Sequence, residues 1–379
     1  MDEFLSIYLS VSNALYMFVL LVIVAVGQIL LKMRDKKRTY PQNWSTVSVL
    51  VSAKNEEDAI VDCLDSLLAL EYPKKKLDIW IVDDQSTDRT AEIIRSYSDS
   101  NDHIHMLSTQ NYDTHLKAKA RGISLAAKHA QGEWFFITDA DSVVHPKWIK
   151  EMLRGSDENT GTIAGMMTVD EKDLVSSLEK IVWSYILPFA FGAAGYGAEF
   201  ISVGPNTAMR SKIYREAGGL EKADFEVAED LALFNMVVES GYKALAHNNR
   251  ETMVRMKPVS TFRDLISQQR RWIKGPFEQA WYYPLGISIV FGFSFLYQIA
   301  IIVAFFYVPK AALLALIARF IAEFSIILIE AIILKQKKVL RYFPLLYIYV
   351  FFAFTFIPFS FMVTRSISWR GKGYKIDYN

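Results

Sequence analysis

Two carboxylates stand one residue apart in the stretch FFITDADSVV, at Asp139 and Asp141, directly after a run of apolar and aromatic residues. Charges at the end of a buried strand are costly unless they are paired, because the charged form loses its hydration. A divalent cation such as Mg²⁺, held by one or two carboxylates together with substrate phosphates, would remove this cost. The alternative is a solvated acidic turn or a helix cap, and the pair alone does not decide between the two.

Further polar stretches have the same two interpretations. In VDDQSTDRT, Asp84 could bind a nucleotide, or Asp84 or Ser86 could cap the helix that we expect from Thr87. In LKAKARG, Lys119 could donate to a phosphate or be a solvated lysine. The AED of residues 228–230 would also suit a helix start, because carboxylates are favourable there.

The elements that would position these residues follow from the apolar pattern. Strands are expected at 47–53, 77–82, 103–107 and 133–141, and helices lie between them, an alternation typical of a parallel sheet. Ligands bind such sheets at the carboxyl ends of the strands. The turns Asn55–Glu56, Asp83–Asp84 and Asp139–Asp141 all follow strands, so we expect them at one edge. Further along the chain, 162–169 is expected to be one strand and 171–188 a helix.

The composition places this region between membrane segments. Of the 379 residues, 52% are hydrophobic and only 22% charged, and 14–31 carry no charge over roughly the ~20 residues that a membrane helix needs. Acidic residues precede this segment and the basic residues of 32–38 follow it, which indicates an uncleaved helix whose C-terminal end is cytoplasmic. Beyond Pro284 the chain is largely apolar almost to Thr364. The domain between is therefore expected to be cytoplasmic.

Several classes of site are excluded. A net charge of +1 without a basic stripe interleaved with aromatics argues against nucleic-acid binding. The single cysteine, Cys63, excludes intrachain disulfides and a cysteine-based zinc site, and its helical context predicts a core residue. Neither a GxGxxG fingerprint nor a GxxxxGK[ST] loop follows the first expected strand.

The joint order of the motifs carries more information than each motif alone. VSAKNEE, VDDQSTDRT, LKAKARG, DAD, AED and QQRRW follow one another between Thr46 and Trp272. In this order the chain resembles the membrane-bound family 2 glycosyltransferases, which include cellulose, hyaluronan and poly-N-acetylglucosamine synthases and ceramide glucosyltransferase. The resemblance implies an α/β fold, a GT-A-type Rossmann-like mixed sheet domain inserted between transmembrane helices.

With the apolar pattern, the resemblance gives five expected parts. They are an N-terminal transmembrane helix at 8–32, a cytoplasmic GT-A domain at 40–258, an amphipathic interface segment with the QxxRW motif at 259–283, a C-terminal transmembrane region of about three segments (285–307, 311–334 and 342–364) within 284–366, and a basic tail at 367–379.

The resemblance also implies roles for individual residues. Glu56 and Asp84 would contact the uridine, with Asp83 in support, and Lys119 would approach the diphosphate. Asp141 would bind Mg²⁺ or Mn²⁺, and Asp139 would bind the nucleotide or the metal.

On the acceptor side, Asp230 would be the general base. Gln268, Arg271 and Trp272 would close over the diphosphate and the acceptor. Lys54 and Ala228 depart from residues found in some members, and RGIS follows the lysine motif where many members have GALN. These differences affect the identity of the donor more than the chemistry.

The implied function is an inverting, metal-dependent transfer of a sugar from a nucleotide-sugar, a UDP-sugar, to a lipid-linked or growing glycan acceptor. The protein would be an integral multi-pass protein of a bacterial inner membrane with a cytoplasmic catalytic domain. One alternative is a processive β-polysaccharide synthase that also secretes its product. The other is an inactive membrane scaffold or transporter, against which the set Asp141, Asp230 and Arg271 argues.

Overall fold

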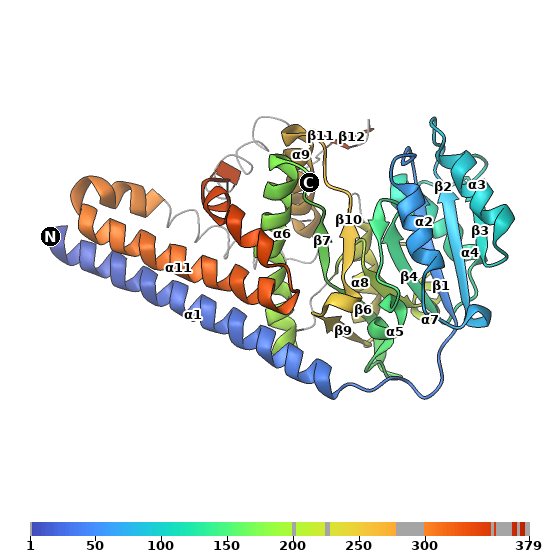
Figure 1. Ribbon diagram of the computed structural model, residues 1–379, viewed down its shortest axis with the longest axis horizontal. Helices are drawn as coiled ribbons and strands as arrows, with labels where there is room; N and C mark the ends of the chain where they lie inside the picture. Colours follow the sequence, from blue (N-terminus) through green and yellow to red (C-terminus); the bar gives the residue numbers. More distant parts are fainter. Residues whose placement is uncertain are drawn as a thin grey trace. The chain divides into compact units, whose positions relative to one another are not determined.

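The computed structural model describes residues 2–198, 202–223, 228–277, 299–349, 352–353, 366–369 and 372–375 (Figure 1). The chain divides into two compact units. We call Met1–Val26, Glu171–Gly192 and Pro258–Asn379 the helical unit, and Gly27–Asp170 with Ala193–Lys257 the sheet unit.

The sheet unit is built on a seven-stranded mixed sheet in the order β3-β2-β1-β4-β8-β6-β9. Strands β1 to β4 are parallel, β8 is antiparallel to β4 and β6, and β6 is parallel to β9. A second sheet has the order β5-β10-β7. The strands are β1 Val47–Ala53, β2 Leu77–Asp83, β3 Ile104–Ser108, β4 Trp134–Asp139, β5 Ser142–Val143, β6 Thr160–Gly165, β7 Met167–Val169, β8 Thr207–Arg210, β9 Lys243–His247 and β10 Val254–Met256.

Helices cover both faces of the main sheet, which explains why its central strands β1 and β4 are buried along almost their whole length rather than alternately. Val49 and Val51 of β1 belong to one core and Leu50 to another. The first core includes Cys63, which is buried as predicted. The helices of this unit are α2 Ile60–Leu68, α3 Thr90–Ser100, α4 Ala118–His129, α5 Trp148–Leu153, α7 Ser211–Glu216 and α8 Glu229–Glu239.

Close packing of α4 on β1 requires one glycine. A Cβ on Gly122 would lie 2.2 Å from the Oγ of Ser52, so a larger residue would push the helix off the strand. Lys119 lies on the same helix, and this contact therefore helps to fix its distance from the end of β1.

Two expectations were wrong in detail. The expected strand at 162–169 is broken after Gly165, and its second half, β7, pairs with β10 in the smaller sheet. The expected helix at 171–188 begins at Leu174 and continues through Pro188 to Gly195 as α6. Apolar runs predict that such elements exist, but the partner of a strand and the end of a helix depend on tertiary contacts.

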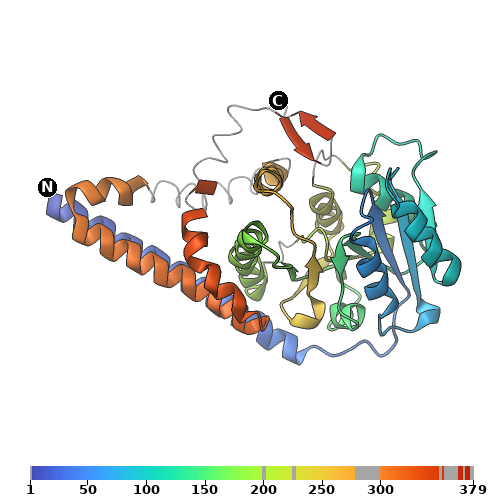
Figure 2. The same cartoon turned by 45° about the horizontal axis from the view of Figure 1, so that its top comes forward.

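The helical unit contains α6 Leu174–Gly195, α9 Phe262–Phe277 and α11 Pro309–Ile333, with the first part of α1 Asp2–Lys37. In both views α11 lies along α1 (Figures 1 and 2). The hairpin strands β11 Ser366–Trp369 and β12 Lys372–Lys375 pair antiparallel. The expected helix at 8–32 is contained in α1, whereas much of the expected segments 285–307 and 342–364 lies outside the described residues.

Among the described residues, α6 and α11 are the helices long and apolar enough to cross a membrane by length and composition. In α6, 56% of the apolar window is buried, as in a core helix, against 39% in α11. The assignment of membrane-spanning segments stays a prediction.

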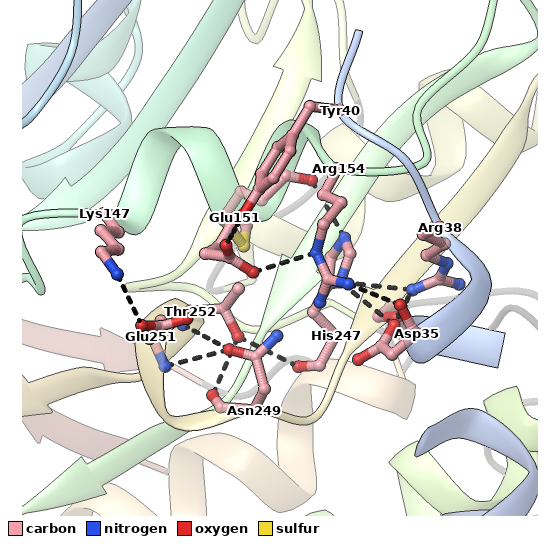
Figure 3. A network of polar contacts seen from close by, with 12 residues as sticks. Asp35, Arg38, Tyr40, Lys147, Glu151, Arg154, His247, Asn249, Glu251 and Thr252 are labelled. Atoms are coloured by element: carbon pink, nitrogen blue, oxygen red, sulfur yellow. Dashed lines mark hydrogen bonds and ion pairs between the residues drawn. The ribbon is translucent and has the colours of Figure 1, made fainter. Parts of the chain in front are cut away.

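A buried polar network attaches the end of α1 to the sheet unit (Figure 3). Arg38, just after α1, donates to the Ala246 carbonyl at 2.7 Å and pairs with Asp35. The ring of His247 lies between Arg38, whose Nη1 is 3.3 Å from the ring Nδ1, and the Met152 carbonyl, whose oxygen is 3.0 Å from the ring Nε2. Because a carbonyl only accepts, Nε2 carries the proton, and burial lowers the pKa of His247.

Candidate active site

The sheet brings the three predicted polar turns to one edge. Strand β1 pairs in parallel with β2 and β4, with Ala53 opposite Asp83 and Ser52 opposite Asp139. The turns that follow these strands therefore leave the sheet side by side, as predicted.

The first two turns are tied to each other by hydrogen bonds. Asn55 has a φ of 54° and Gln85 a φ of 60°, in the left-handed region where asparagine is tolerated best. The Asn55 N–H donates to the Ser86 Oγ at 3.0 Å, and the Thr87 N–H donates to the Asn55 Oδ1 at 2.8 Å. The predicted helix start at Thr87, capped by Asp84 or Ser86, is wrong: α3 begins at Thr90, and Ser86 and Thr87 instead brace the neighbouring turn.

Asp84 is buried against a basic residue that sequence reasoning did not single out. Its side chain is 1% exposed, and Oδ1 accepts from the Arg121 Nε at 2.6 Å and from the Thr109 Oγ1 at 2.8 Å. The Lys54 Nζ donates to the Asp84 carbonyl at 2.9 Å. The only signal for Arg121 was its place in LKAKARG, two residues after Lys119. The predicted role of Asp84 at the uridine stays a prediction.

Lys119 joins three segments at the centre of the site. Its Nζ lies 2.6 Å from the Asp139 Oδ1 and 3.3 Å from the Glu229 Oε1, and it donates to the Gly204 carbonyl at 2.8 Å. Burial alone would lower the pKa of Lys119, but the two carboxylates outweigh it and raise that pKa. A protonated lysine therefore offsets one negative charge of this acidic cluster at neutral pH.

Asp230, the predicted base, lies beside this cluster at the start of α8. A Cβ built on Gly204 would be 3.5 Å from the Asp230 Oδ2 and 3.7 Å from the Lys119 Nζ, so the carboxylate and the ammonium flank the same backbone. Burial and the neighbouring Glu229 raise the pKa of Asp230 to about 6, against the lowering effect of Lys119. A carboxyl with this pKa can take a proton near neutral pH.

Asp139 and Asp141 end β4 and begin the turn after it. The Asp141 carbonyl accepts from the Lys257 N–H at 3.0 Å, which links the turn to the end of β10. Among the described residues no cluster of three or more His, Cys, Asp or Glu could hold a metal by itself. Two carboxylates nevertheless fit Mg²⁺ or Mn²⁺ when a diphosphate supplies further oxygens, since Mg²⁺ is commonly bound that way.

Two other predicted residues of the sheet unit lie in the first two turns. Asp83 accepts from the Ser86 N–H at 3.2 Å, and the Glu56 N–H donates to the Thr90 Oγ1 at 2.8 Å. Both residues are buried at 6% exposure, and the Asp83 carboxylate helps to hold the turn after β2 in shape. The predicted roles of Glu56 and Asp83 at the nucleotide stay predictions.

The predicted residues of the QxxRW motif belong to the helical unit, on α9. The Gln268 side chain is buried and donates from Nε2 to Glu179 at 2.8 Å. The Trp272 ring packs on Trp183 with centroids 3.9 Å apart, and Arg271 is half-buried. Sequence reasoning missed both partners on α6, because nothing local in the sequence marks them.

The class of protein follows from the matches to known families. Residues 48–218 match glycosyl transferase family 2, and residues 134–363, more than half of the chain, match glycosyl transferase family group 2. The chain belongs to this family group.

Similar proteins carry related names. The probable glycosyltransferase YdaM of Bacillus subtilis is 28% identical over 221 residues, which are 56% of this chain and 50% of YdaM. A β-monoglucosyldiacylglycerol synthase of Nostoc sp. is 32% identical over 120 residues, 32% of this chain and 25% of the synthase. A poly-β-1,6-N-acetyl-D-glucosamine synthase of Staphylococcus aureus is 30% identical over 132 residues, 34% of this chain and 30% of the synthase. The matches span half or less of these relatives.

A solved structure shares the fold. The mannosyltransferase PcManGT from Pyrobaculum calidifontis, in complex with GDP-Man and Mn²⁺, aligns with a TM-score of 0.52 at 17% identity, covering 86% of this chain and 99% of that one. The predicted GT-A-type α/β fold is thereby confirmed.

Proposed function

We propose that the protein is an inverting, metal-dependent glycosyltransferase that moves a sugar from a UDP-sugar to a lipid-linked or growing glycan acceptor at the membrane. The observation that carries this proposal is the Lys119 cluster. It combines a cation, the strand-end carboxylate of Asp139 and a base of raised pKa, Asp230, at the edge where such sheets bind ligands.

On the donor side, the chain must stabilise the charge that grows on the leaving diphosphate. Asp139 and Asp141 would hold the metal, which supplies a Lewis acid for the diphosphate oxygens. Lys119 would exchange part of its contact with Asp139 and Glu229 for a phosphate oxygen, since an ammonium offers three donors. Arg271 would add a second fixed positive charge.

On the acceptor side, a hydroxyl must lose its proton as its oxygen attacks the anomeric carbon. Asp230 would take that proton, because burial and Glu229 keep its pKa at about 6, nearer to neutrality than an exposed aspartate. Attack opposite the leaving diphosphate inverts the anomeric centre, so an α-linked donor gives a β-linked product.

A lipid acceptor is favoured by two observations. α11 is long and apolar enough to enter a membrane, and a β-monoglucosyldiacylglycerol synthase is among the similar proteins. The second candidate is a processive β-glycan synthase, favoured by the likeness to a poly-β-1,6-N-acetyl-D-glucosamine synthase.

The test is a transfer assay with detergent-purified protein and Mn²⁺. Radiolabelled UDP-glucose, UDP-N-acetylglucosamine, UDP-galactose and GDP-mannose are each incubated with phosphatidylglycerol vesicles that carry dioleoylglycerol or with a total membrane lipid extract. We expect label from one UDP-sugar to enter a lipid-soluble product, and Asp230→Asn protein to form none. Label in a large water-soluble polymer would instead support the processive synthase. A protein that neither hydrolyses nor transfers any of these sugars would refute the proposal.

A further inference from the structure

Two side chains of α6 meet two side chains of α9 in matched spacing. Glu179 contacts Gln268, and Trp183 contacts Trp272 at 3.9 Å between ring centroids with a 52° tilt. Both pairs are four residues apart on their helices, and residues at this spacing lie on one helix face. The first and last residues of the QxxRW motif are therefore both fixed by α6.

The carboxylate of Glu179 determines which way the amide of Gln268 points. Its Oε2 accepts from the Val259 N–H at 2.9 Å, and its Oε1 accepts from the Gln268 Nε2 at 2.8 Å. A carboxylate offers only acceptors, so the amide must turn its NH₂ toward α6. The Gln268 Oε1 therefore points away from Glu179, where it is buried and has no hydrogen-bond partner among the described residues.

An amide held in this direction selects its ligand. The outward Oε1 accepts a hydrogen bond, and phosphate oxygens also only accept, so the two do not pair. A sugar or glycerol hydroxyl donates a proton and does pair. A buried acceptor left without a donor is costly, which favours binding of a ligand with a hydroxyl at that position.

We propose that Glu179 is a positioning residue for the acceptor: it fixes Gln268 as a hydrogen-bond acceptor for a substrate hydroxyl, and leaves the diphosphate to Arg271. This inference rests on the proposed glycosyl transfer and changes the expected role of Gln268, from the diphosphate to the acceptor.

The test exchanges the two groups. In Glu179→Gln, the oxygen of the new amide accepts from the Val259 N–H and its NH₂ faces α9, so Gln268 must turn its own oxygen toward α6 and its NH₂ outward. In the double variant Glu179→Gln with Gln268→Glu, the amide now on α6 accepts from Val259 and donates to the carboxylate now on α9, whose second oxygen again presents an acceptor. Glu171→Gln is the control, since Glu171 precedes the same helix but pairs with Lys180 and Arg341.

The measurements are KM for dioleoylglycerol in phosphatidylglycerol vesicles, KM for the UDP-sugar that the wild type uses, and the melting temperature. We expect Glu179→Gln to raise KM for the lipid about tenfold, the value of one hydrogen bond, with a smaller change in KM for the donor. The double variant should recover most of this loss, and Glu171→Gln should match the wild type in both constants.

Equal changes in both KM values, or a double variant whose KM for the lipid stays as high as that of Glu179→Gln, would refute the inference while an active wild type upholds the proposed function. A wild type that neither hydrolyses nor transfers any UDP-sugar would instead refute the proposed function, and the inference with it.

Discussion

The Nζ of Lys119 lies 2.6 Å from the Oδ1 of Asp139, and the same ammonium contacts Glu229 at 3.3 Å. One positive charge is thus shared between the end of β4 and the start of α8, where Asp230 lies. Because the lysine lowers the pKa of Asp230 against the effects of burial and Glu229, the donor side and the base are electrostatically coupled.

Removal of this charge should therefore move the pH dependence of the reaction. In Lys119→Met, the pKa of Asp230 should rise above about 6, because burial and Glu229 then act without compensation. The acid limb of kcat against pH should shift to higher pH. Lys117→Met, which removes an exposed lysine of the same segment, is the control and should leave the limb in place. An unmoved limb in Lys119→Met would show that the two groups are not coupled.

Loss of the base should separate chemistry from binding. Asp230→Asn should lower turnover by roughly two or more orders of magnitude, the range for a positioned base, and keep donor affinity close to wild type. In the wild type, kcat should rise with pH through about 6, because the base acts in its deprotonated form. Initial rates and calorimetric titration with the UDP-sugar measure the two effects. A donor affinity that falls as steeply as turnover would make Asp230 a binding residue.

The metal is best tested through binding. Asp141→Ala should abolish the part of UDP-sugar affinity that depends on Mn²⁺, since a carboxylate at the end of β4 would be lost from the cation. Calorimetric titrations with and without Mn²⁺ measure this difference, and Asp113→Ala, a change of an aspartate outside the strand-end turns of the same unit, is the control. If Mn²⁺ still raises the affinity of Asp141→Ala for the UDP-sugar as much as it does in the wild type, Asp141 does not bind the metal.

Arg271 and Trp272 should differ although they are neighbours. Arg271→Ala should reduce transfer and donor hydrolysis alike, because the leaving diphosphate is common to both. Trp272→Ala should reduce transfer more, because an indole offers the acceptor a flat face and offers a phosphate no charge. The ratio of transfer to hydrolysis is measured for each, with membrane extraction as control for insertion. Equal ratios in both variants would favour a shared role as anchors at the bilayer surface.

The network at the end of α1 should make stability depend on pH. The pKa of His247 is lowered from its ordinary 6.5 by burial, with Arg38 and Arg154 adding to this and Asp35 opposing it. As the pH falls, His247 is therefore protonated in the unfolded chain before it is protonated in the folded protein. The contribution of neutral His247 to stability is present above about pH 6.5 and is lost as the pH falls through the pKa of His247 in the folded protein.

His247→Gln keeps a donor for the Met152 carbonyl and removes the titrating ring. Between pH 7.5 and 5.5 we expect the melting temperature of the wild type to fall about 2–4 °C more than that of His247→Gln, as for a loss of about 1 kcal/mol. Asp230 titrates with the opposite sign in the same range, but its contribution is common to both proteins and cancels in the difference between them. Parallel curves would show that His247 keeps its ordinary pKa.

The sequence by itself determined the elements and the edge that carries the site. Apolar runs such as VSVLVSA and WFFIT that end in polar turns predict parallel strands, and parallel strands end at the same edge, so Asp83 and Asp139 lie at that edge on either side of β1. The identity of Asp230 as a candidate base also followed from the order of the motifs, and Cys63 is buried as its helical context predicted. Such features are local, and periodicity records them.

Only the tertiary structure decided which groups are paired. Arg121 bonds to Asp84 across 37 positions and Glu179 to Gln268 across 89, and in each case a residue that no local pattern distinguishes sets the charge or direction of a predicted site residue. The same holds for β7, which leaves the main sheet although its sequence continues β6. A side chain's local sequence specifies its donors and acceptors, whereas its partner is whichever group the packing of distant elements brings within about 3 Å.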